Sequence, residues 1–111
     1  MPLSRIEQLI ANDTRDREAS ARARAAHALD LLAERGVEAR VIGSLARGDF
    51  RLHSDVDLLV LRCPPALRYR IEGLVEDALQ GLPFDVVYLD EVKPERRADI
   101  QRRSLDASDL R

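Results

Sequence analysis

The stretch that decides the fold of this 111-residue chain is residues 43–60, GSLARGDFRLHSDVDLLV. It opens with Gly43 and Ser44 and ends in a run of Leu and Val that begins beside Asp55 and Asp57. Glycine lets a backbone approach a ligand closely, and a serine hydroxyl with neighbouring amides can bind phosphate oxygens. The stretch therefore predicts a phosphate-approaching turn followed by a strand that carries two carboxylates.

Asp55 and Asp57 are two residues apart, so on a strand their side chains point to the same face. At about 5 Å and an effective dielectric near 20, two such charges repel by about 3 kcal/mol. A divalent cation, a basic residue or a raised pKa must offset that repulsion. Mg²⁺ suits a site with few carboxylates, because it keeps waters and takes phosphate oxygens as further ligands. The pair predicts a metal site.

Asp85 is the third acid to consider, near the start of an apolar segment at residues 84–89. A charge in such a segment is costly unless it has a partner or a function. If this strand lies beside the strand of Asp55 and Asp57, the three acids surround one or two metal ions.

Two common phosphate-binding loops do not fit. Gly43 and Gly48 have the separation of the P-loop glycines, but Asp49 and Phe50 stand where the P-loop needs Lys and Ser or Thr. The residues after Gly43 also exclude the dinucleotide-binding pattern G-x-G-x-x-G.

Outward from this stretch, the patterns predict an α/β fold in which a small mixed β-sheet is packed with helices. The strand at residues 55–61 is expected to be central and covered on both faces. The residues after about 104 carry little apolar content and are expected to be frayed or held by a partner. The expected helices are 4–11, a long one from a break at 12–14 to about 35, a short turn at 46–48, 67–80, and 94 to about 104, and the other expected strands are 37–42 and 84–89.

The composition limits the number of domains, the partners and the cellular location that we expect. The chain has the length of a single domain, residues 1–111, with 45% hydrophobic residues and a net charge of −2, which gives no general attraction for nucleic acid. Cys63 is the only cysteine, and neither a membrane-spanning run nor a signal peptide is recognised. We therefore expect a cytoplasmic protein with no membrane partner.

The motif Gly43-Ser44-x-Ala46-Arg47-Gly48, followed by Ser54-Asp55-x-Asp57-Leu58-x-Val60, resembles the signature of the DNA polymerase β-like nucleotidyltransferase superfamily. It is most similar to the minimal nucleotidyltransferase (MNT) branch, and the resemblance runs from about Val41 to Leu89. The short chain is consistent with that branch, whose larger relatives carry an additional domain.

The resemblance implies roles for the residues singled out above. Gly43 and Ser44 would hold the triphosphate of ATP, and Arg47 would contact phosphate or form a structural ion pair with an acid such as Asp49. Asp55, Asp57 and Asp85 would ligate two Mg²⁺ ions and act in catalysis. In two-metal catalysis the ions stabilise the attacking and leaving oxygens.

MNT proteins often act as antitoxins beside a HEPN-domain ribonuclease toxin. The resemblance therefore implies a protein adenylyltransferase that moves AMP from ATP to a hydroxyl, expected to be a tyrosine's, of a partner HEPN toxin. Two alternatives remain open at this point. One is a binding module that masks its partner by contact without catalysis, and the other is a nucleotidyltransferase acting on RNA or a small molecule.

Overall fold

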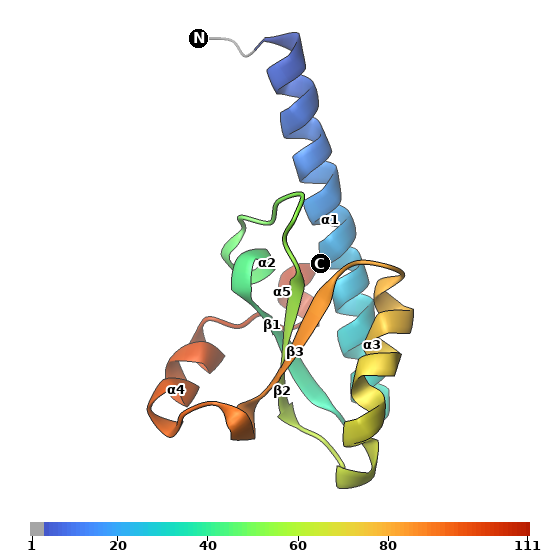
Figure 1. Cartoon of the computed structure of the whole chain (residues 1–111), viewed down its shortest axis with the longest axis vertical. Coiled ribbons are helices and arrows are strands. Elements are labelled where there is room, and N and C mark those ends of the chain that lie inside the picture. Colours follow the sequence, from blue (N-terminus) through green and yellow to red (C-terminus); the bar gives the residue numbers. More distant parts are fainter. Residues whose placement is uncertain (1–3) are drawn as a thin grey trace.

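The computed structural model describes residues 4–111 as helices packed around a small β-sheet (Figure 1). A 3₁₀ helix, η1 (Pro65–Arg70), precedes α3, so the predicted helix at 67–80 is two helical segments, and a second, η2 (Leu89–Glu91), follows β3. The remaining elements are α1 (Arg5–Glu34), β1 (Glu38–Ile42), α2 (Gly43–Arg47), β2 (Val56–Arg62), α3 (Ile71–Leu79), β3 (Phe84–Tyr88), α4 (Pro94–Arg102) and α5 (Ala107–Leu110).

The sheet has three strands in the order β1-β2-β3, with β1 antiparallel and β3 parallel to β2. A mixed sheet was predicted, and it follows from the connections. The short link between β1 and β2 reverses the chain, whereas the link from β2 to β3 contains η1 and α3 and returns the chain in the same direction. β2 is therefore the central strand.

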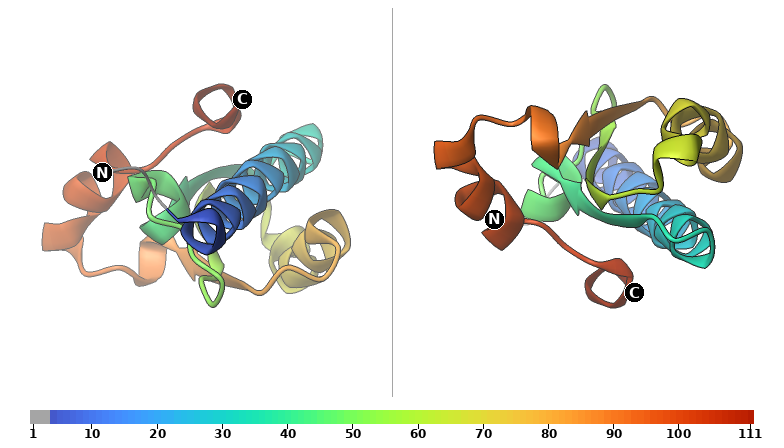
Figure 2. Two further views of the ribbon diagram at one scale, coloured as in Figure 1. Left: turned by 90° about the horizontal axis from the view of Figure 1, so that it is seen from above. Right: turned by 90° about the horizontal axis from the view of Figure 1, so that it is seen from below.

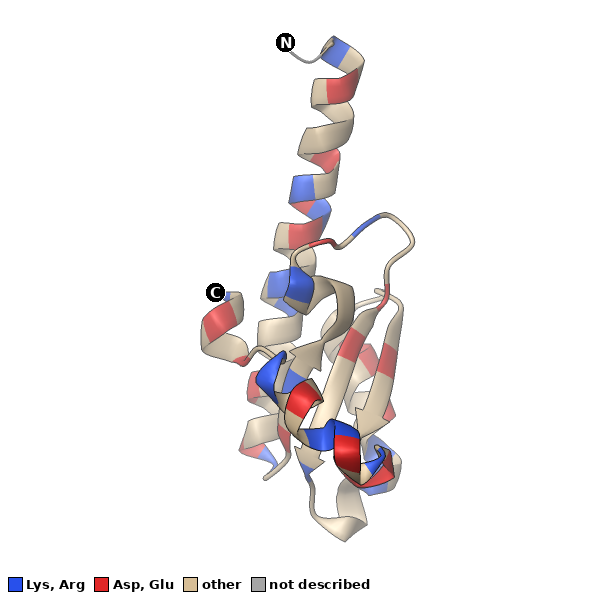
Figure 3. Cartoon of the chain, turned by 90° about the vertical axis from the view of Figure 1, so that its left-hand side faces the viewer, with Lys and Arg blue, Asp and Glu red and all other residues tan. Residues whose placement is uncertain are grey.

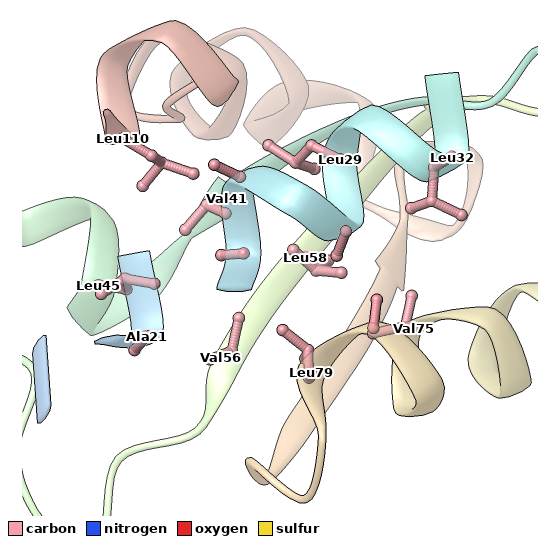
Figure 4. Close-up of a cluster of buried hydrophobic side chains, with 14 of the residues drawn as sticks. Ala21, Leu29, Leu32, Val41, Leu45, Val56, Leu58, Val75, Leu79 and Leu110 are labelled. Carbon is pink, nitrogen blue, oxygen red and sulfur yellow. The ribbon is translucent and has the colours of Figure 1, made fainter. Parts of the chain in front are cut away.

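The hydrophobic core lies between the sheet and the helices α1 and α3 (Figure 4). From β2, Val56, Leu58 and Val60 point into it, and all three are buried. Leu59 alternates to the opposite face and is also fully buried. That second face is covered only in part, as the half-buried Asp57 and the exposed Asp85 show.

α1 is a single helix of 30 residues, so the predicted break at residues 12–14 is wrong. The side chains expected to break the helix instead bond within it. The Thr14 hydroxyl donates to the Ile10 carbonyl at 3.0 Å, and Asp13 pairs with Arg17 one turn later at 2.9 Å. Ser4 accepts the predicted N-cap bond from the Glu7 amide. No helix within residues 4–111 is long and apolar enough to cross a membrane.

The chain end is ordered by its own domain, so the prediction of a frayed or partner-held terminus is wrong. Leu105 forms a two-way bridge with Val41 of β1, and Leu110 of α5 is buried against the core. Arg22 of α1 donates to the carbonyls of Asp109 and Leu110, at 2.7 and 3.2 Å. One buried leucine and backbone bonds thus hold a segment whose composition is mostly polar.

Candidate active site

Two of the predicted acids lie side by side on neighbouring strands. In the parallel β2–β3 pair, Asp57 is the direct partner of Asp85. Residues paired in this way point to the same face of a sheet, so both carboxylates stand on the incompletely covered face. Figure 3 shows acidic positions next to each other on the two strands. The sheet register therefore produces the expected convergence of these two acids.

Gly43 lies directly against Asp57. Ile42, the residue before Gly43, pairs with Asp57 across β1 and β2, and α2 begins at Gly43 with a φ of +73°. A Cβ placed on Gly43 would lie 2.3 Å from Oδ2 of Asp57 and 3.1 Å from its Cγ. Glycine is therefore required twice, by a left-handed backbone and by the carboxylate that occupies the space of a side chain.

The electrostatics at Asp57 show how closely the acids interact. Partial burial raises the pKa of Asp57 above its ordinary value, and the charges of Asp85 and Asp55 raise it further, while Arg47 acts in the opposite direction. The pKa of one carboxylate thus responds to both of the other predicted acids and to the predicted basic residue. All four charges belong to one electrostatic site.

A metal ligand set is not preformed in the side chains. Asp55 lies just before β2 and is exposed, and the Asp85 carboxylate accepts a bond from the amide of Val86 at 3.1 Å. Across residues 4–111, no group of three or more His, Cys, Asp or Glu side chains is gathered closely enough to hold a metal ion. The donor chemistry still fits Mg²⁺, because carboxylate oxygens are its preferred protein ligands and the repulsion around Asp57 favours a cation. Metal ligation by Asp55, Asp57 and Asp85 remains a prediction.

Arg47 and Ser44 sit on the short helix α2. Arg47 forms a 3.5 Å ion pair with Asp49, and both side chains are largely exposed. Arg47 also lines the cleft described below, and its charge opposes the rise in the pKa of Asp57. It therefore forms an ion pair with Asp49 and lies next to the candidate acids. The Ser44 carbonyl accepts the amides of Gly48 and Asp49, which closes α2 and leaves its hydroxyl half-exposed.

A cleft of about 720 Å³ adjoins Gly43 and runs between α2 and α4. Ile42, Val92 and Ile100 supply apolar lining, and the charged residues around it are Arg47, Lys93, Arg96, Asp99 and Arg103. Four of these five charges are basic, and a volume of several hundred Å³ is typical of small-molecule sites. In Figure 3 the basic positions of α4 lie in front of the sheet face that carries the acids.

Sequence reasoning missed the contribution of α4. The recognised motif ends at β3, and no role was predicted for the basic residues of the segment 93–103. The clue in the sequence was their spacing: Arg96 and Arg103 are seven residues apart and share one helical face. That face lines the cleft beside α2, and the chain that follows α4 is joined to β1 by the bridge between Leu105 and Val41.

The chain belongs to the nucleotidyltransferase domain family, whose model matches residues 25–106. A solved structure described as "putative minimal nucleotidyltransferase" is similar at 34% sequence identity with a TM-score of 0.61. The match covers 74% of this chain and 86% of that one. A search of curated proteins gave no match. The α/β fold and the general class of nucleotidyl transfer are thereby confirmed.

Proposed function

We propose that this protein is a Mg²⁺-dependent protein adenylyltransferase that moves AMP from ATP to a hydroxyl, expected to be a tyrosine's, of a HEPN-family toxin, and so acts as its antitoxin. One observation carries the proposal furthest. Asp57 is packed against Gly43, which lines a basic cleft, and is paired with Asp85 on the neighbouring strand. Carboxylates that could hold a cation therefore lie close to basic side chains that could bind a polyphosphate.

The residues divide the chemistry between them. Arg47, Lys93, Arg96 and Arg103 place positive charge around the cleft, where it would bind the triphosphate. Gly43 leaves the phosphates room to approach the backbone. Asp55, Asp57 and Asp85 would hold Mg²⁺, which when bound neutralises phosphate charge and polarises the phosphoryl oxygens.

Asp85 is suited to receive the proton of the acceptor. Its carboxylate is exposed, so a hydroxyl carried by another molecule can reach it. The acceptor oxygen forms a bond to the α-phosphorus of ATP, and the bond from that phosphorus to the bridging oxygen breaks. Pyrophosphate leaves with the electron pair, and the hydroxyl proton passes to Asp85. AMP remains on the acceptor.

The test uses two labels and the protein encoded by the neighbouring gene. With Mg²⁺, label on the α-phosphate of ATP should appear on that protein, whereas label on the γ-phosphate should not, because it leaves with pyrophosphate. Asp55→Asn/Asp57→Asn should abolish both labelling and neutralisation of the toxin. Glu76 is an exposed acid on α3 outside the site, so Glu76→Gln is the matched control. This variant should keep both the labelling and the neutralisation of the toxin.

The result also separates the competing functions. A double variant that still neutralises the toxin without labelling it would establish masking by contact and contradict the adenylyltransferase proposal. Label found only on RNA or on a small molecule would move the protein to the other class of nucleotidyltransferase.

Charge reversal in the cleft should weaken ATP binding selectively. Arg96→Glu is expected to raise the KM for ATP by roughly tenfold, equivalent to about 1.4 kcal/mol, because a cation facing phosphate is replaced by an anion. The expected kcat is changed far less, since Arg96 lies on α4 and not among the acids. Steady-state kinetics with varied ATP provides the measurement. Arg70→Glu, an exposed reversal at the end of η1, is the control, and an equal rise in KM for it would contradict the assignment.

A further inference from the structure

The N-terminal part of α1 projects beyond the rest of the molecule and carries an apolar stripe (Figure 1). Ile6, Leu9 and Ile10 are 70%, 61% and 62% exposed, although they follow the i, i+3, i+4 spacing of a buried helix face. The part of the chain that matches the family model begins only at residue 25. The projecting turns thus lie outside the matched part of the chain, and within residues 4–111 their apolar face stays mostly exposed.

The same face of α1 continues into a groove. Leu9, Asp13 and Ser20 are separated by four and seven residues, so they lie along one side of the helix. Ser20 and Arg17 line a groove of about 280 Å³ whose other wall includes Phe50, Leu52, Leu82 and Pro83. Leu52 is 60% exposed. Seen along α1 in Figure 2, left, the loop before β2 and the turn before β3 lie on the same side of the helix.

We propose that this face binds the same face of a second copy, giving a two-fold dimer in which the two α1 helices lie antiparallel. Ile10 from the apolar stripe of each copy then enters the groove of the other. This inference does not depend on the proposed function, because none of its residues is among the predicted acids or lines the cleft.

We assign the register of the pair by charge complementarity between Asp13 and Arg17. With the two-fold axis at the level of residue 15, position 10 of one helix lies opposite position 20 of the other, and position 13 lies opposite position 17. Ile10 is then placed over Ser20 in the groove. Asp13 of each copy faces Arg17 of the other, so the ion pair already present within each chain becomes an alternating set of four charges. An isologous interface requires such self-complementarity.

The test compares charge reversals by light scattering coupled to size-exclusion chromatography. The wild-type chain should have twice the 12.5 kDa monomer mass. Asp13→Arg and Arg17→Asp should each shift it to the monomer, and the double variant Asp13→Arg/Arg17→Asp should restore the dimer. Arg15→Asp is the control, because residue 15 is two positions from both and points away from the face.

Crosslinking tests the register independently. Ile10→Cys and Ser20→Cys, each combined with Cys63→Ser, should form a mixed disulfide when the two proteins are combined, and neither protein should crosslink efficiently alone. Positions 10 and 20 are about 15 Å apart on one helix, so no bond can form within a chain. The proposal is overturned by a monomeric wild-type protein, by a folded charge-swap variant that stays monomeric, or by a dimer that does not crosslink between these positions.

Discussion

Asp57→Asn is expected to lower nucleotidyl transfer by at least about 100-fold while making the folded chain more stable at neutral pH. The loss follows from the position of the carboxylate between Gly43 and Asp85. An amide there cannot supply the negative charge that would hold a cation beside the phosphate. The gain follows from the surroundings of Asp57, since burial and two neighbouring acids oppose its ionised form. Activity and stability should therefore change in opposite directions.

The sign of the pH dependence follows from the same shift. The pKa of Asp57 is higher in the folded chain than its ordinary value of 3.8. Ionisation of this carboxyl therefore destabilises the folded state relative to the unfolded state. The difference in melting temperature between Asp57→Asn and the wild type should be positive at pH 7. It should shrink as the pH falls toward 3.8 and vanish only below that value, where the wild-type carboxyl is protonated in both the folded and the unfolded state.

Thermal unfolding across pH and a single-turnover assay provide the measurements. Asp77→Asn removes an exposed charge on α3, away from the site, and should leave the activity unchanged. A variant that keeps more than a tenth of the activity, or that is less stable than the wild type at pH 7, would contradict this account of Asp57.

The strands could be predicted, and the candidate acids could be selected, because both are local patterns. The apolar run after Asp57 predicts a buried strand, and the two-residue spacing of Asp55 and Asp57 predicts a shared face. The partnership of Asp57 with Asp85 could only be stated conditionally, because it depends on which strands are neighbours and on their register. Register is a tertiary property, set by the crossover through α3 and by packing of the core.

The mistaken predictions also have physical causes. Asp13 and Thr14 disfavour helix interiors in isolation, but an ion pair one turn away and a bond to the preceding turn compensate for both. The polar C-terminal segment looked unanchored because its support, Arg22 of α1 and Val41 of β1, is distant in sequence. Contacts of this range leave no local pattern to recognise.

Gly43→Ala is expected to damage both folding and catalysis. A non-glycine residue at a φ of +73° costs about 1–2 kcal/mol, and the added methyl group would also overlap Oδ2 of Asp57. Either the carboxylate or the start of α2 must move, and both belong to the site. We expect a loss of transfer approaching that of Asp57→Asn, with a free energy of unfolding lowered by more than the backbone strain alone.

Gly48→Ala separates the two effects. Gly48 ends α2 at a φ of +82°, close to that of Gly43, but a Cβ there would meet nothing within 4 Å. Its replacement should therefore cost only the backbone strain and leave most of the activity. Chemical denaturation of the two variants, with the same activity assay, makes the comparison. Equal costs at the two positions would show that the carboxylate does not determine the need for glycine at position 43.

A double-variant cycle tests the contact itself. In an Asp57→Ala background the carboxylate is gone and only the Asp57 Cβ, 3.3 Å from the added methyl, remains near residue 43. Gly43→Ala should then cost about as much free energy of unfolding as Gly48→Ala, so the two changes at positions 43 and 57 are less than additive. Additive costs would mean that the glycine and the aspartate are independent. A coupled pair would instead identify the first glycine of the motif as the residue that makes room for the carboxylate.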